Sequence, residues 1–179
     1  MGLRNPLLIV ACLLALTSPG LASANNDSRL PADLKATLTL CGTGLLEAWG
    51  FLDVGYGSLY RPDCNRPWDL YLSEVRYMEF NYEREIPANA FRESARTLLL
   101  RQGFQDSPAL EAFHRAYLDA KAGDTYALYF TPDDGLRLFL NNKLLGHLKD
   151  PRLAEGYFAI WLGTQPFDEA LKQALLGQP

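Results

Sequence analysis

The residues of this chain that could take part in catalysis or metal binding are few and widely spaced. His114 and His147 are its only histidines, which excludes a histidine-rich metal site and leaves at most one axial haem ligand. Asp133-Asp134 is an acidic pair in a turn, where such pairs are common. The sequence holds no Gly-rich phosphate loop, no G-x-S-x-G and no Cys/His metal spacing. We therefore expect no metal and no cofactor, and no catalytic residue stands out.

The beginning of the chain predicts export. Met1–Asn5 carries one arginine and no acid, Leu7–Leu16 is apolar, and Ala22-Ser23-Ala24 is a small-x-small cleavage site. We expect cleavage of the signal peptide 1–24 and a periplasmic protein, with residues 25–35 as a flexible lead-in. Ile9–Cys12 formally fits a lipobox, which is the alternative. The apolar run is too short for a membrane span, and no later segment offers the ~20 apolar residues that one needs.

Two cysteines remain after cleavage, in a compartment where disulfides form. Cys41 lies in the first predicted strand, and Cys64 can reach it only if Arg61–Pro67 folds back. We predict a possible Cys41–Cys64 disulfide, with two separate thiols and a buried Cys41 as the alternative.

The composition favours one acidic domain. Loss of Arg4 with the signal peptide leaves 16 Lys+Arg against 21 Asp+Glu, a net charge of −5. No basic patch for nucleic acid is present. Nearly half of the residues are apolar, so one domain over residues 36–177 can bury a sizeable core.

The elements that must position any site begin with three strands and two helices. Thr37–Gly44 and Phe51–Tyr60 alternate around a break at Glu47–Gly50 and predict a hairpin. Leu70–Tyr82 predicts a third strand with one wetter face. One helix should begin at Pro87 and end near Gly103, and another at Ser107-Pro108. The second should turn these side chains inward: Leu110, Phe113, Tyr117 and Leu118.

The C-terminal third predicts three strands and two more helices. Asp124–Thr131 and Leu136–Leu140 flank a Pro-Asp-Asp-Gly turn, and Asn141-Asn142 supplies a tight turn into Lys143–Leu148. Asp150-Pro151 should cap a helix that ends at Gly163, with Trp161 anchoring it against the sheet. A final helix is expected within Phe167–Leu176.

The order of motifs in this third resembles the bacterial chalcone isomerase-like family. The motifs run from Gly123-Asp124 through Pro132–Gly135 and Asn141–Lys143 to Trp161–Gly163 and Pro166, within a likeness that covers about Ala36–Gly177. The resemblance implies an α+β open-faced sandwich. The order of elements independently predicts a largely antiparallel sheet with helices packed on one face.

The resemblance also implies a cleft between sheet and helices, in which the family's enzymes use an Arg and a Thr. The segment that matches the family's Gly-x-Gly-x-Arg has Leu46 at the Arg position, and Gly55 falls near the Thr position. A cation at a developing negative charge is worth several kcal/mol, and leucine supplies none of it. Arg84 and Arg92 are candidates to place a cation there from another element, although such an arginine is more often solvated or paired at the surface than a ligand clamp.

Three functions remain open from the sequence. The first is a non-catalytic binder of an apolar or amphipathic small molecule such as a fatty acid, the ligand of some family members. The second is an isomerase or lyase with a changed active site. The third is an accessory protein without a small ligand. The missing arginine favours the first over the second, and the sequence does not identify protein partners.

Overall fold

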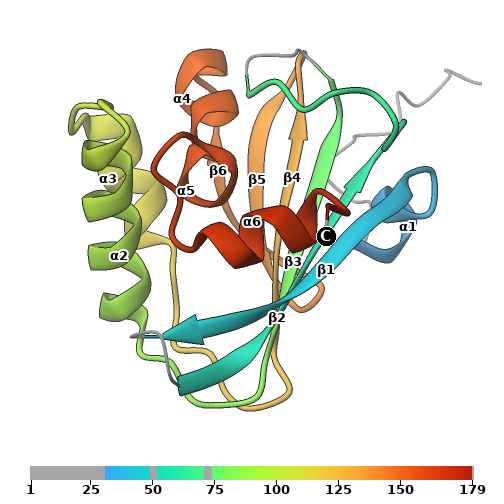
Figure 1. Cartoon of the computed structure of the whole chain (residues 1–179). Coiled ribbons are helices and arrows are strands. Elements are labelled where there is room, and N and C mark those ends of the chain that lie inside the picture. Colours follow the sequence, from blue (N-terminus) through green and yellow to red (C-terminus); the bar gives the residue numbers. More distant parts are fainter. Residues whose placement is uncertain (1–30, 49–51, 71–73, 179) are drawn as a thin grey trace, which may run out of the picture.

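A six-stranded antiparallel sheet forms the centre of the protein (Figure 1). The computed structural model describes residues 31–48, 52–70 and 74–178, so the predicted signal peptide, its alternative lipobox and residues 25–30 lie outside the described residues. Strands that follow one another in the chain are neighbours in the sheet, as in a meander. The strands are β1 (Thr39–Ala48), β2 (Leu52–Arg61), β3 (Arg76–Tyr82), β4 (Thr125–Thr131), β5 (Gly135–Leu140) and β6 (Lys143–Leu148).

The predicted hairpins are present. β1 pairs with β2, although β1 extends to Ala48 across part of the expected break, the rest of which is not described. The turn between β4 and β5 ends at Gly135 with a φ of 91°, and Asn141 takes a φ of 54° between β5 and β6. Glycine and asparagine tolerate such angles, which is why these turns could be read from the sequence. The third strand was expected from Leu70, but β3 starts only at Arg76. Glu74, just before it, accepts a hydrogen bond from Arg61 Nε.

Helices cover the concave face of the sheet, with α2 and α3 side by side at one end and α6 across β1 and β2 (Figure 1). Ser107, Asp150 and Asp168 cap three of them by accepting hydrogen bonds from backbone N–H groups three residues on. The helices are α1 (Pro31–Lys35), α2 (Ala88–Arg101), α3 (Pro108–Arg115), α4 (Pro151–Gly156), α5 (Ala159–Leu162) and α6 (Glu169–Leu175).

Three predictions about helices need correction. The helix expected from Pro151 to Leu162 is broken into α4 and α5. At the break, the N–H groups of Ile160 and Trp161 donate to the carbonyl oxygens of Tyr157 and Phe158, three residues back, as in a 3₁₀ turn. Leu118 does not face inward and is 44% exposed, because α3 ends at Arg115 and its helical spacing does not continue. Residues 31–35 form α1 rather than part of a flexible lead-in.

The helix α1 packs on the face of the sheet opposite to the other helices. Leu34 is buried there against Tyr77, Ala127 and Phe139. Lys35 Nζ lies 2.8 Å from both carboxylate oxygens of Glu79. Met78 and Phe80, on either side of Glu79 in the strand, belong instead to the main core on the other face. The beginning of the domain is therefore fixed to the sheet by one leucine and one partly buried ion pair.

Glycines in the first hairpin allow α6 to pack directly on the strands. A Cβ atom added at Gly42 would lie 1.9 Å from the carbonyl oxygen of Ala174, and one at Gly44 would lie 2.8 Å from the Cβ of Ala174. Contacts as short as these do not occur between real atoms, so no side chain fits without moving α6. Gly42 and Gly44 therefore serve packing between the first strand and the last helix.

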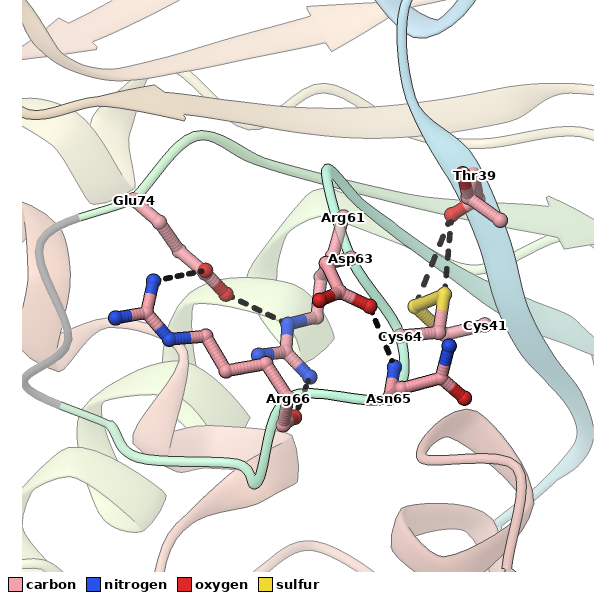
Figure 2. The surroundings of a disulfide bond; sticks show 8 residues. All are labelled: Thr39, Cys41, Arg61, Asp63, Cys64, Asn65, Arg66 and Glu74. Carbon is pink, nitrogen blue, oxygen red and sulfur yellow. Dashed lines mark hydrogen bonds and ion pairs between the residues drawn. A yellow bond between two sulfur atoms is a disulfide. The ribbon is translucent and has the colours of Figure 1, made fainter.

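A disulfide joins Cys41 of β1 to Cys64 in the segment that follows β2 (Figure 2). The chain folds back after β2, so the two Cα atoms lie 5.2 Å apart. Arg61, the last residue of β2, donates from Nε to Oε1 of Glu74 in this segment at 2.6 Å, and Arg61 is 2% exposed. The disulfide and this buried ion pair hold the segment against the end of the sheet.

Candidate functional site

The candidate site is a cavity of about 530 Å³ between the concave face of the sheet and helices α2 and α5. Leu46, Phe80 and Leu128 contribute the sheet side, while Phe91 and Leu98 contribute the helix side. Alternation along each strand places these side chains on one face, and spacing of three and four residues places the helical ones on the facing side. The cavity is therefore a mainly apolar chamber built from distant parts of the chain.

Polar side chains border this chamber in two places. Arg84, Glu85 and Ser94 are exposed and lie where the cavity meets the surface. Tyr82, Tyr117 and Tyr126 are buried and line the interior. The tyrosine rings pack on Phe91, which lies 5.3 Å, 5.4 Å and 5.0 Å from their respective ring centres.

Burial controls the protonation of the interior tyrosines. It raises the pKa of Tyr117, and it raises the pKa of Tyr126 despite a hydrogen bond to the Leu118 backbone that opposes the rise. For Tyr82, burial raises the pKa well above its usual value, with Tyr117 and Tyr126 adding to the effect. The interior of the cavity therefore presents neutral phenols.

The residues proposed from the sequence fall at different places relative to the cavity. Leu46 is buried and lines it, so an apolar group stands where the resemblance expects a cation. Arg84 also lines it, and its Nε donates to the carbonyl oxygen of Asp53 at 2.6 Å. Leu46 and Arg84 are thus brought to one cavity.

Gly55 and Arg92 do not line the cavity. Gly55 has a φ of 152°, and an added Cβ would lie 1.9 Å from the carbonyl oxygen of Asn81. A threonine therefore does not fit at this position. Arg92 Nη2 donates to the carbonyl oxygen of Tyr117 at 2.7 Å, which ties α2 to the segment after α3. Its guanidinium serves this packing contact.

Sequence reasoning did not single out Tyr82 or assign Trp161 to the site. Tyr82 ends the alternation Met78, Phe80, Tyr82 that marks the inner face of β3, which was the available signal. Trp161 packs against the sheet as predicted, with its ring 4.9 Å from that of Phe80, and it also borders the cavity. Only the three-dimensional arrangement shows that one side chain does both.

A second buried polar cluster lies apart from the cavity and stabilises the fold. Arg76 is fully buried, and its guanidinium carbon lies 4.9 Å from the ring centre of Trp68 and 5.4 Å from that of Phe130. Burial lowers the pKa of Arg76 to about 10, while Glu155, 3.5 Å away, opposes this shift. The indole N–H of Trp68 donates to the carbonyl oxygen of Leu162. The cluster connects β3 to the end of α5.

Within the described ranges, no group of His, Cys, Asp and Glu side chains could hold a metal ion. In the same part of the chain, no helix is both long and apolar enough to cross a membrane. The cavity is open at an edge that carries Arg84 and Glu85.

Comparison with known proteins gives a family and a fold. No curated protein matches this sequence. Among solved structures, the fatty-acid binding protein AtFAP1 of Arabidopsis thaliana is similar, with a TM-score of 0.63 and 19% identity. The match covers 79% of this chain and 87% of that protein, so the two share a fold. A model of the chalcone isomerase-like family matches residues 22–177, and this chain therefore belongs to the chalcone isomerase-like family.

Proposed function

We propose that this protein binds an apolar or amphipathic small molecule in the cavity between the sheet and helices α2 and α5. The observation that carries the proposal is the chamber of about 530 Å³ with a mainly apolar lining and an edge that bears charged groups. Small-molecule sites typically measure about 300–1,000 Å³ and combine apolar walls with a few polar groups. Burial of an apolar ligand surface would supply the binding energy.

A fatty acid is the form of ligand that we favour. Arg84 supplies a guanidinium at the exposed edge of the cavity, where it can meet a carboxylate while the acyl chain enters the chamber. The fold is shared with a protein described as fatty-acid binding, which supports the same choice.

Catalysis of the chalcone isomerase type is disfavoured on this proposal. Leu46 is buried in the wall at the position where the resemblance puts the catalytic arginine, and Gly55 leaves no room for the second group. Flavanone formation from a chalcone should therefore stay at the uncatalysed rate. A clear acceleration by the purified protein would favour an isomerase with a changed active site.

We further propose a periplasmic location. The Cys41–Cys64 disulfide supports it, because such bonds persist in oxidising compartments and are rare in the cytosol. The expected signal peptide is the other support.

The cavity is tested by filling it. Ala90 lines the chamber from the first turn of α2, whereas its neighbour Asn89 is exposed and does not line it. Ala90→Trp should weaken binding of dodecanoic acid at least tenfold in calorimetric titration, because the indole would occupy ligand space. Asn89→Trp is the matched control and should bind as the parent does. Equal affinities for parent and both variants, or no binding by the parent, would overturn the proposal.

The role of Arg84 is tested with two ligands of one length. Arg84→Gln should weaken the binding of dodecanoic acid by up to about fivefold, because an exposed ion pair contributes ~0–1 kcal/mol. Binding of 1-dodecanol should not change, because that ligand carries no charge. An equal loss for both ligands would show that the arginine acts through packing.

A further inference from the structure

Three strands meet in one row at the wall of the cavity. Leu46 of β1 pairs with Gly55 of β2, and Gly55 pairs with Tyr82 of β3. Leu46 contributes an alkyl group and Gly55 no side chain, so Tyr82 is the residue of this row that carries a polar atom. It lines the cavity and is only 7% exposed.

The other tyrosine hydroxyls nearby already have partners. Those of Tyr117 and Tyr157 lie 3.3 Å apart and bond each other. The Tyr126 hydroxyl donates to the carbonyl oxygen of Leu118 at 2.8 Å and accepts from the Leu118 N–H at 2.9 Å. Among the residues that the structure describes, the Tyr82 hydroxyl has no hydrogen-bond partner. Its oxygen is not one of the fully buried atoms without a partner, so it is open to the cavity.

A ligand that fills the cavity would displace water from the Tyr82 hydroxyl. A hydroxyl that is then buried without a partner is costly, whereas one that is paired with the ligand discriminates strongly between ligands. Because the phenol stays neutral, it can donate to a carbonyl or hydroxyl oxygen and can also accept from a hydroxyl. A ligand made only of hydrocarbon would leave it unpaired. A ligand with an oxygen atom in the interior would satisfy it.

On the basis of the proposed function, we infer that Tyr82 is a specificity-determining residue of the cavity. Its hydroxyl selects apolar ligands that carry a carbonyl or hydroxyl oxygen in their buried part. This contact is separate from the one at Arg84, which lies at the exposed edge. The preferred ligand class is therefore an oxygenated apolar molecule.

The test compares two probes that differ by one hydroxyl, 2-naphthol and naphthalene, with the parent protein and Tyr82→Phe. The substitution keeps the ring and removes only the oxygen. Tyr82→Phe should weaken 2-naphthol about three- to tenfold, the worth of one neutral hydrogen bond, and leave naphthalene within about twofold. Tyr56→Phe, which removes the hydroxyl of an exposed tyrosine outside the cavity, is the control and should not change the ratio of the two affinities.

The melting temperature distinguishes a role of Tyr82 in binding from a role in stabilising the fold. Tyr82→Phe should melt at or above the parent's temperature, because no protein hydrogen bond is lost, whereas Tyr126→Phe should melt lower. Equal weakening of both probes, an unchanged affinity for 2-naphthol, or a lowered melting temperature for Tyr82→Phe would each overturn the inference. If the parent binds dodecanoic acid while Tyr82→Phe leaves the ratio of the 2-naphthol and naphthalene affinities unchanged, the cavity function stands and the role of Tyr82 fails. If the parent binds none of these ligands, both fail.

Discussion

His114 is a buried titratable side chain outside the cavity. It lies on α3 and is 8% exposed, with its ring centre 5.9 Å from that of Tyr157. Its Nε2 is buried and has no hydrogen-bond partner among the described residues. Burial lowers the pKa of His114, and Arg96 adds to the effect, while Asp106 and Glu111 oppose it. The folded protein therefore favours the neutral imidazole.

This residue should make stability depend on pH in the acidic range. The pKa of His114 is lower in the folded chain than its usual value of 6.5, so protons bind more readily to the unfolded state. The stabilisation is complete above that value and is lost as the pH falls through the folded pKa. His114→Gln should flatten this part of the profile, measured as the free energy of unfolding in urea between pH 7.5 and pH 5. Parallel profiles for parent and variant would contradict the assignment.

Among the elements, β1 and α6 form the contact that connects the two ends of the domain. Gly42 and Gly44 let the backbone of α6 approach the strand directly, and Leu171 and Leu175 of that helix are buried. The indole of Trp68 and the side chain of Lys172 bond the carbonyl oxygens of Leu162 and Gly163, which fixes the path into α6. The contact depends on the absence of side chains at two positions of β1.

A single methyl group should disturb this contact. Gly42→Ala places a Cβ atom where the carbonyl oxygen of Ala174 lies, so α6 must shift, at a cost of about 1–3 kcal/mol or more. Chemical denaturation of the purified variant measures this loss. Leu45→Ala is the control on the outward face of the same strand, where the loss should stay below about 1 kcal/mol. A Gly42→Ala variant as stable as the parent would show that α6 is not held this closely.

Local signals in the sequence were enough for most elements but not for the site. Turns and caps such as Pro132–Gly135, Asn141 and Asp150 depend on the residues themselves, and the structure contains them. The break between α4 and α5 follows instead from tertiary packing, since Tyr157 and Phe158 are fully buried. The cavity joins side chains from distant elements, which no local period encodes. Of the four ligand-binding candidates from the sequence, Leu46 and Arg84 line the cavity, whereas Gly55 and Arg92 do not.

At the scale of the whole molecule, an apolar chamber and a disulfide belong to one small acidic domain. Cys41 and Cys64 enclose a loop with a sequence separation of 23, which includes most of β1 and all of β2. Cross-links of this kind stabilise by about 2–4 kcal/mol, largely through the unfolded chain. This stabilisation suits a protein that works away from cytosolic reductants, as proposed above.

One mass measurement tests the expected maturation. Protein recovered from the periplasm of a bacterial host should begin at Asn25 and weigh two hydrogens less than the reduced chain, because of the Cys41–Cys64 bond. Treatment with reductant should restore the two hydrogens without changing the N-terminus. A lipidated chain that begins at Cys12 would contradict the expected cleavage site. Full alkylation of both thiols without reductant would contradict the disulfide.

The packing of α6 on β1 also has a consequence for the order in which the chain can fold. The sheet pairs sequential neighbours, so its hairpins can form while the ribosome is still adding residues. The glycine surface of β1, however, is covered by α6, which follows all the other described elements in the chain and is therefore made after them. Until then the domain is incomplete, and this surface of its first hairpin lacks the helix that covers it. A chain that is easy to unfold until α6 has been added would suit the export that we propose above.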